Sequence, residues 1–168
     1  MGESMKFTEL DQYLFGQGTN YEVYKKLGAH PVTYRRRKGV YFAVWAPNAR
    51  SVGVVGDFNE WNAEANKMQP VQQSGIWDLF IPGVKKGDLY KFAVETSQGY
   101  TVLKADPYGN ASQLRPDNAS VVTDISHFVW EDDEWRAAHQ EKQINVPMAI
   151  YEVHPGSWKK DPDMPGEF

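Results

Sequence analysis

The chain has 168 residues, 41% of them hydrophobic, and a formal net charge of -4. This size and apolar content favour one globular domain with short extensions, and the negative charge argues against nucleic acid or anionic membrane as a partner. Cysteine is absent, which excludes disulfide frameworks and thiolate zinc sites.

The N-terminal segment has acidic residues where a secretory signal has basic ones, and it contains no continuous apolar stretch. No apolar run elsewhere approaches the ~20 residues that cross a bilayer. We therefore expect a cytoplasmic protein without a membrane-spanning segment.

The first elements expected along the chain are helical. Residues 5–15 predict a short helix that Gly16 ends, because four apolar residues share one face: Phe7, Leu10, Leu14 and Phe15. A second helical turn is expected over residues 20–27, before Gly28 and Pro31. We assign residues 1–33 to a short helical N-terminal extension.

From Val40 the apolar period changes to two, which indicates strands. The expected strands span residues 40–45, 51–55, 75–81, 89–95, 100–103 and 120–123. Turn-forming residues separate them, and most of the intervals lack a helical pattern. We predict a mainly β fold, an immunoglobulin-like antiparallel β-sandwich over residues 34–125. The basic run 35–38 is interpreted as a solvated lead-in to its first strand.

The C-terminal part differs from the sandwich in composition. Residues 126–147 have the character of a connector, with a short helix or an irregular segment within 128–143. The apolar run 148–153 then predicts a last strand, which needs partners to bury its faces. We expect it to begin a second domain, with residues 148–168 as its stub; the alternative is a strand at the sandwich edge.

Several residues suit the recognition of a sugar. Alternation along residues 89–95 points Tyr90, Phe92 and Val94 inward and Lys91 outward. A glucose ring offers an apolar face and a polar rim, so its receptors combine flat aromatic rings with hydrogen-bonding groups. The candidates are the rings of Trp61 and Tyr100, the amine of Lys91, and the side chains of Asn118 and Ser120. The alternatives are a core role for Trp61 and an ordinary surface position for Lys91.

The chain contains none of the familiar enzyme motifs. Glycine-rich phosphate loops, an H-E-x-x-H helix and a G-x-S-x-G elbow are missing. The acidic run 131–134 is interpreted as solvated, and the four histidines lack metal-ligand spacing. We therefore expect no catalytic residue, metal or cofactor in this chain.

Four kinds of motif, in order along the chain, resemble bacterial glycogen branching enzymes. The matching segments are 13–19 with 24–30, then 44–49 with 56–62, then 103–109, and finally 149–158. The second group resembles the glycogen-binding module that precedes the catalytic barrel in that family. The last segment resembles the first strand of a (β/α)8 barrel and the loop after it.

The resemblance implies a function and a site. Branching enzymes cut an α-1,4-linked glucan and rejoin the piece through an α-1,6 bond, with a retaining mechanism whose catalytic carboxylates lie on later barrel strands. The related module of the AMP-activated kinase β subunit stacks sugars on two tryptophans, with a lysine between them in sequence. By motif Trp61 matches the first tryptophan, Lys91 the lysine and Tyr100 the second tryptophan, while Asn118 aligns loosely.

The expected function is therefore an α-glucan-binding N-terminal module of a 1,4-α-glucan branching enzyme of glycogen biosynthesis. Its expected partners are glycogen, starch or maltooligosaccharide and the catalytic barrel of the parent enzyme. Because the catalytic carboxylates come later in the family's sequence, we expect this chain to be inactive alone. Two alternatives remain open: a free-standing glucan-targeting module, and the N-terminus of a debranching or trehalose-forming amylase.

Overall fold

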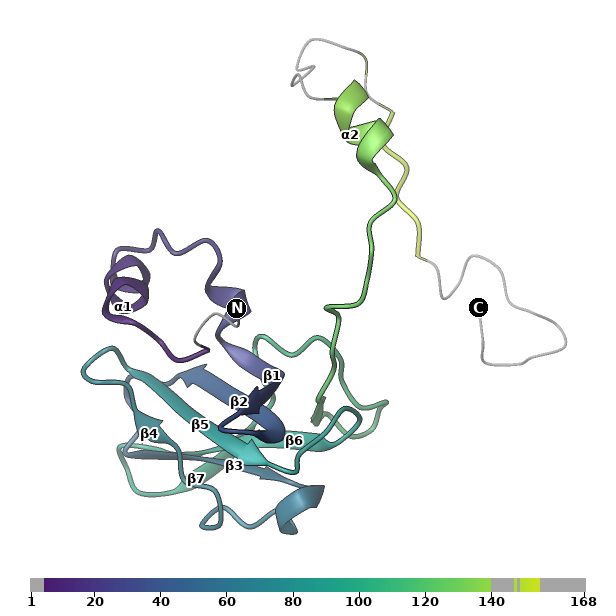
Figure 1. The fold of residues 1–168 in the computed structure, drawn as a ribbon. Coiled ribbons are helices and arrows are strands. Elements are labelled where there is room, and N and C mark those ends of the chain that lie inside the picture. The colour runs from purple at the N-terminus through teal and green to yellow at the C-terminus, as the bar shows by residue number, and fades with distance from the viewer. Residues whose placement is uncertain (1–4, 140–146, 148, 155–168) are drawn as a thin grey trace, which may run out of the picture. The chain divides into compact units, whose positions relative to one another are not determined.

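The computed structural model describes residues 5–139, 147 and 149–154. The chain forms two compact units, Met1–Phe128 and Val129–Phe168. The first unit contains all the strands of the described residues (Figure 1). A search of the described residues finds no candidate membrane-spanning helix.

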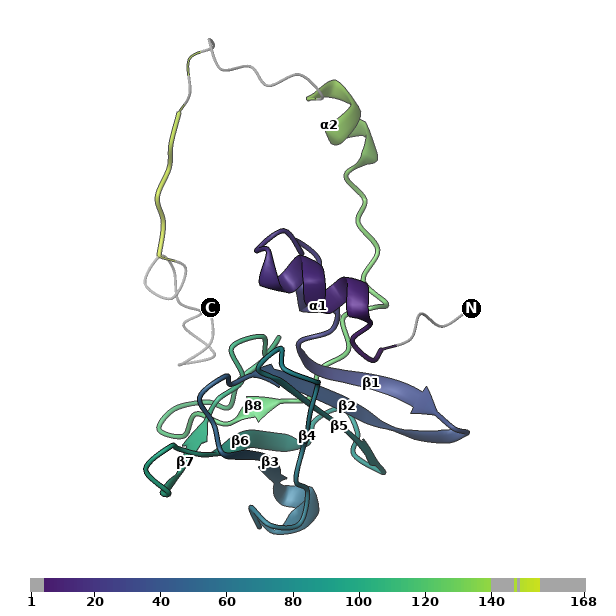
Figure 2. The same ribbon diagram turned by 90° about the vertical axis from the view of Figure 1, so that its left-hand side faces the viewer.

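The first unit is an antiparallel β-sandwich, as the sequence predicts. One sheet has the order β1-β2-β5-β4, and the other has the order β3-β6-β7 with β8 paired to β6. The strands are β1 (Gly28–Tyr34), β2 (Arg37–Trp45), β3 (Ser51–Gly56), β4 (Gln69–Pro70), β5 (Ile76–Pro82), β6 (Leu89–Glu95), β7 (Thr101–Lys104) and β8 (Ser120–Val121). Figure 2 shows the β3-β6-β7 sheet below the other sheet.

The main core lies between the two sheets and follows from the alternation of apolar residues. Val40 and Phe42 on β2 face Val54 on β3 and Phe92 on β6, and all four are fully buried. The Phe42 and Tyr90 rings meet across the sheets with centroids 5.1 Å apart. The inward positions predicted for Tyr90 and Phe92 are confirmed.

The N-terminal segment covers the outer side of the β1-β2-β5-β4 sheet. Helix α1 (Glu9–Gly16) begins later than the sequence predicts, at an N-cap where Thr8 and Asp11 form a capping box. The 3-10 helix η1 (Val23–Lys25) follows it. A second apolar cluster joins this segment to the sheet: Phe7, Leu27, Tyr41, Ala43 and Ile76. Figures 1 and 2 both show α1 above that sheet.

The β region begins earlier than the sequence predicts, which corrects the assignment of residues 28–33 to the helical extension. Strand β1 pairs with β2 along its whole length, from Gly28 opposite Ala43 to Tyr34 opposite Arg37. The basic run is therefore a hairpin turn and the start of β2, and not a lead-in to the first strand. Pro31 is tolerated because β1 lies at the edge of its sheet.

The second unit has little regular structure among its described residues. It contains α2 (Asp133–Ala138), which lies within the segment where a short helix or an irregular connector was expected. Residues 149–154 form no strand. This differs from the predicted strand over 148–153, since a strand forms only with a hydrogen-bonded partner; Met148 and residues 155–168 lie outside the described residues.

Candidate functional site

Helix α1 covers the outer side of the β1-β2-β5-β4 sheet, but it does not cover the outer side of the β3-β6-β7 sheet. Paired residues of an antiparallel sheet point to the same side, so this outer face carries Lys91 and Glu95 of β6 with their partners Val55 and Ser51 of β3. Leu103 of β7 lies opposite Ala93 on the same face and is exposed. We call this surface the outer face.

The loop between β3 and β4 folds back over part of the outer face. A Cβ on Gly53 would lie 2.7 Å from the Ala63 carbonyl oxygen, so only glycine permits this approach. The return segment pairs with the free edge of β3, where the Met68 amide donates to the Val52 carbonyl. Val55 is fully buried, whereas Lys91 beside it is partly exposed. The loop thus leaves Lys91 accessible to solvent.

Trp61 lies in this loop, just after the 3-10 helix η2 (Asp57–Asn59). Its backbone amide donates to the Gly56 carbonyl, and its indole Nε1 donates to Asp57 Oδ1 at 2.9 Å. The residue keeps 36% of its surface exposed. Trp61 is one of the exposed large hydrophobic residues and does not belong to either core cluster, so the core alternative is not supported.

Lys91 and Asn118 come together although 27 residues separate them. The Lys91 ammonium donates to Asn118 Oδ1 at 2.6 Å. This contact follows from the register, in which Tyr90 lies opposite Ser120 and so brings the end of the 112–119 loop beside β6. Two of the five candidate site residues thus form one polar pair on the surface, a cationic donor and an amide.

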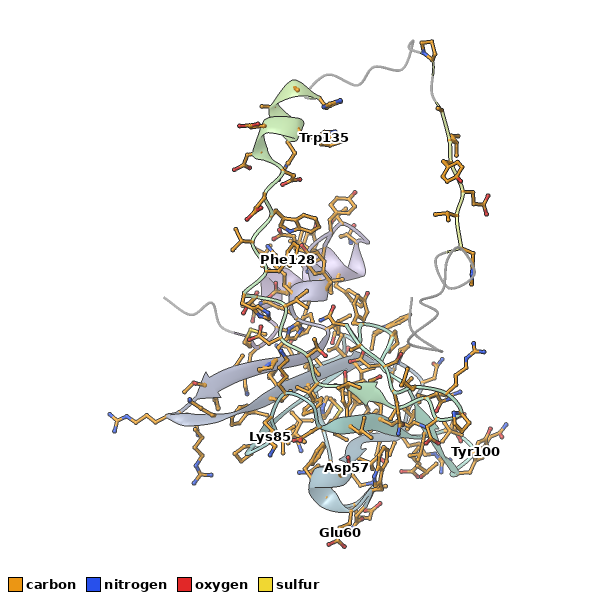
Figure 3. The ribbon with its side chains drawn as sticks, turned by 90° about the vertical axis from the view of Figure 1, so that its right-hand side faces the viewer. Asp57, Glu60, Lys85, Tyr100, Phe128 and Trp135 are labelled. Carbon is orange, nitrogen blue, oxygen red and sulfur yellow. The ribbon has the colours of Figure 1, made fainter. Side chains whose placement is uncertain are left out.

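Tyr100 lies away from the loop that carries Trp61. Thr101 lies opposite Glu95, whereas Gly56, which anchors Trp61, lies opposite Tyr90. Positions 90 and 95 are separated by about 17 Å at roughly 3.4 Å per residue. Figure 3 accordingly shows Tyr100 well apart from Asp57 and Glu60. Tyr100 is 55% exposed, so it is accessible to a ligand at the other end of the sheet.

Ser120 does not belong to the site, which corrects the expectation that it contacts sugar. It is buried, and its hydroxyl accepts a hydrogen bond from the Asp106 amide at 2.9 Å. The Asp106 carboxylate in turn accepts from the Tyr90 hydroxyl at 2.5 Å. Burial and then the Asp106 carboxyl raise the pKa of Tyr90, which keeps this hydroxyl protonated as a donor. Ser120 thus supports the core beneath β8.

Asp57 belongs beside the predicted residues, and Leu114 lies in the same loop as Asn118. Asp57 fixes the Trp61 indole, and only the spacing of an acceptor four residues before a tryptophan signals this role in the sequence. Leu114 is 88% exposed and lies in the loop that carries Asn118. The Gln113 backbone amide closes this loop by donating to the Ala119 carbonyl. No sequence pattern singles out Leu114, because isolated exposed apolar residues are common.

The outer face can bind a flat polyhydroxylated ring. It offers an indole plate, a cationic donor beside an amide and an exposed apolar side chain, and it brings no acid and base pair into a cleft. Among the described residues no group of three or more histidine, aspartate and glutamate side chains is arranged to hold a metal. The arrangement suits recognition of a sugar surface.

Comparison with known proteins identifies relatives of this chain. It is 52% identical over 164 residues to the 1,4-alpha-glucan branching enzyme GlgB of Butyrivibrio fibrisolvens, covering 97% of this chain and 26% of that protein. It is 48% identical over 163 residues to the protein of the same name from Protochlamydia amoebophila, covering 96% and 22%. The chain thus spans about a quarter of the length of these relatives.

Among solved structures, a pullulanase of Klebsiella pneumoniae complexed with maltotriose aligns with a TM-score of 0.46 and 28% identity, over 58% of this chain and 9% of that one. The sequence pattern of carbohydrate-binding module 48, described as the isoamylase N-terminal domain, matches residues 26–109. That match covers half of the chain and includes the strands from β1 to β7. The chain therefore belongs to the carbohydrate-binding module 48 family.

Proposed function

We propose that this chain is the α-glucan-binding N-terminal part of a cytoplasmic 1,4-α-glucan branching enzyme, and that the outer face holds the glucan. The observation that carries the binding site is the Lys91–Asn118 pair, which lies on the uncovered side of the β3-β6-β7 sheet beside the loop that presents Trp61. The relatives that match nearly the whole chain, and that carry the branching-enzyme name, support the parent activity.

In this proposal each residue has a distinct role. The Trp61 indole stacks on the apolar face of a glucose unit, with its plane set by the bond to Asp57. The Lys91 ammonium and the Asn118 amide bond to ring hydroxyls. Tyr100, at the other end of the sheet, contacts a unit further along the same glucan chain. In this proposal the outer face holds the glucan, and the branching reaction takes place in the catalytic barrel that follows in the parent enzyme.

Isothermal titration with maltoheptaose tests the binding face. We expect Trp61→Ala and Lys91→Ala each to weaken binding about tenfold or more, which corresponds to about 1.4 kcal/mol for a lost stacking or charge-assisted contact. Asp57→Asn, which keeps an acceptor oxygen for the indole, should bind more tightly than Asp57→Ala. Tyr21→Ala and Lys38→Ala are matched controls outside the outer face, and they should bind like the wild type. Equal affinities for all variants would reject this site.

The gene provides a separate test of the parent activity. We expect the reading frame that contains this segment to continue into an amylase-type barrel, and the complete protein to introduce α-1,6 linkages into amylose. Proton NMR of the product counts those linkages directly. A complete gene product without a barrel would favour a free-standing glucan-targeting module.

A further inference from the structure

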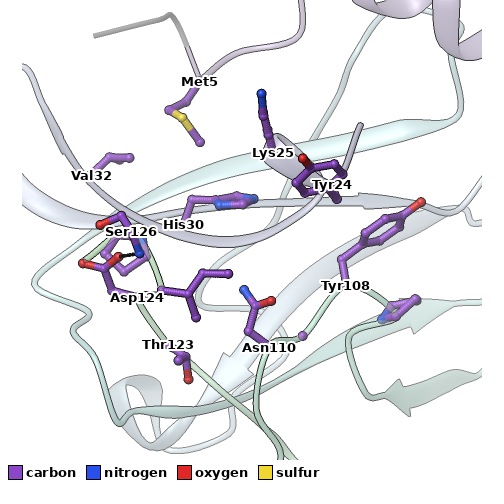
Figure 4. Close-up of a pocket in the computed structure, with 14 residues that line it drawn as sticks. Met5, Tyr24, Lys25, His30, Val32, Tyr108, Asn110, Thr123, Asp124 and Ser126 are labelled. Atoms are coloured by element: carbon purple, nitrogen blue, oxygen red, sulfur yellow. Dashed lines mark hydrogen bonds between the residues drawn. The ribbon is translucent and has the colours of Figure 1, made fainter. Parts of the chain in front are cut away.

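A hollow lies on the first unit, and it shares no residue with the outer face. It has a volume of about 530 Å³, within the range of roughly 300–1,000 Å³ that is typical of ligand sites. The N-terminal segment, β1, the segment after β7 and the segment after β8 line it, and all four belong to Met1–Phe128. Figure 4 shows the hollow and its lining side chains.

Two tyrosine rings lie on one side of the hollow. Tyr24 is 56% exposed and Tyr108 is 39% exposed, and Figure 4 shows them on the same side of it. Asp124 and Ser126 lie on the opposite side, with His30 and Asn110 between the two sides. Apolar residues complete the lining, among them Pro31, Val32, Pro107 and Ile125. The hollow thus combines aromatic plates, an apolar surface and a polar rim.

The core fixes the position of Tyr108. Its backbone amide donates to Asp106 Oδ1 at 2.8 Å, and Asp106 is itself buried and bonded to Tyr90. A Cβ at Gly28 would lie 3.2 Å from the Tyr108 Cβ, so β1 approaches this residue closely because position 28 is glycine with φ +106°. The Tyr108 ring is therefore attached to a rigid support, which lowers the entropy lost when a ligand binds.

The polar groups of the hollow fit hydroxyls better than a charged ligand. His30 Nε2 lies 2.9 Å from the Leu27 carbonyl, which requires a proton on Nε2 and leaves Nδ1 of the neutral ring as an acceptor. Lys25 and Asp124 are the lysine and the carboxylate of the lining, and they cancel in formal charge. Lys25 also pairs with Glu22 at 2.6 Å, which further reduces its attraction for an anion.

From these features we infer that the hollow is a second carbohydrate site, which takes a short segment of neutral α-glucan between Tyr24 and Tyr108 on one side and Asp124 on the other. The choice of α-glucan rests on the proposed function, whereas the polyhydroxylated and uncharged nature of the ligand rests on the lining itself. Two separated sites on one module would let it hold two chains, or two parts of one branched chain.

An NMR titration of the ¹⁵N-labelled chain with maltoheptaose tests this inference. The background is the double variant Trp61→Ala/Lys91→Ala, which disables the outer face and leaves the hollow intact. We expect the amide signals of Tyr108, Gly109, Asn110 and Asp124 to shift in a saturable manner in this background. Tyr24→Ala and Asn110→Ala, which change exposed side chains, should each raise the Kd of these shifts at least fivefold, whereas Tyr21→Ala should not.

The outcomes separate the two proposals. Shifts near Trp61 and Lys91 in the wild type, with none at residues 108–110 or 124 in either background, would overturn the second site and leave the proposed function in place. Shifts at residues 108–110 alone would support the second site and reject the outer face. Equal shifts with cellohexaose would mean that the hollow takes sugars without preference for the α linkage, contrary to the inference.

Discussion

Glu60 and Trp61 hold left-handed backbone conformations in succession, with φ of +54° and +59°. This region costs a residue with a side chain about 1–2 kcal/mol relative to glycine. The bonds of Asn59 offset that cost, because its side chain accepts from the Gly56 amide and donates to the Val54 carbonyl. Backbone strain that neighbouring contacts maintain is typical of functional loops, which supports the binding role proposed for Trp61.

Asp106 is a buried carboxyl of the first unit. Burial raises the pKa of Asp106 above its ordinary value of 3.8, while the hydrogen bonds from Tyr90 and Tyr108 act in the opposite direction. The folded chain therefore holds this proton more tightly than the unfolded chain does. Its contribution to the free energy of unfolding is greatest below pH 3.8 and declines as the pH rises through the folded-state pKa.

The variant Asp106→Asn tests this dependence. Its amide can still accept from the Tyr108 amide and can donate to the Tyr90 oxygen, but it does not titrate. The free energy of unfolding of the wild type, minus that of the variant, should decrease as the pH rises from about 3 to about 7. Urea unfolding of both proteins across this range measures the difference, and an increase with pH would contradict the burial argument.

At the scale of elements, the β1–β2 hairpin turns through Arg35 and Arg36, whose φ values are +47° and +64°. Tyr34 lies opposite Arg37, so these two residues form the whole loop, a geometry in which asparagine and glycine are usual. The Arg35 guanidinium lies 5.3 Å from the centre of the Tyr34 ring, a cation–π contact. The turn therefore uses two residues with poor intrinsic preference for it.

Arg36→Gly should consequently stabilise the chain. Glycine adopts positive φ without the contact between Cβ and backbone, so we expect the free energy of unfolding to rise by about 1 kcal/mol. The matched control is Arg37→Gly, which removes the same charge one residue later, within β2, and should lower it by about 0.5–1 kcal/mol. Urea unfolding distinguishes the two variants, and destabilisation by both would mean that the Arg36 side chain has a structural role.

At the scale of the molecule, the two sheets differ in how they are covered. The N-terminal segment buries the outer side of one sheet through Phe7, Leu27 and their neighbours. A single loop covers only part of the outer side of the other sheet, through the close approach of Ala63 to Gly53. Both apolar clusters lie within Met1–Phe128, so this unit contains what a stable domain needs.

A chain of residues 1–128 should therefore fold by itself. We expect one cooperative thermal transition, with a Tm within about 4 °C of that of the sandwich in the longer chain, which is a change of about 1 kcal/mol or less for a domain of this size. Circular dichroism follows the transition. A chain that ends at residue 99 is the control: it lacks β7 and β8 and should not unfold cooperatively. Loss of cooperativity in the 1–128 chain would show that the sandwich depends on later residues.

The sequence by itself determined the mainly β class and most of the strands, because alternation and turn residues are local signals. It missed β1, since Gly28 and Pro31 resemble breakers unless the strand is known to lie at an edge. It also identified Lys91 as outward-facing and Trp61 as a candidate plate. Two contacts were visible only in the tertiary structure: the bond between Lys91 and Asn118, and the bond from the Trp61 indole to Asp57. The burial of Ser120 and the position of Tyr100 at the other end of the sheet were likewise visible only there. The physical reason is that register between distant strands and the course of a loop over a sheet depend on packing of the whole unit, which no local pattern contains.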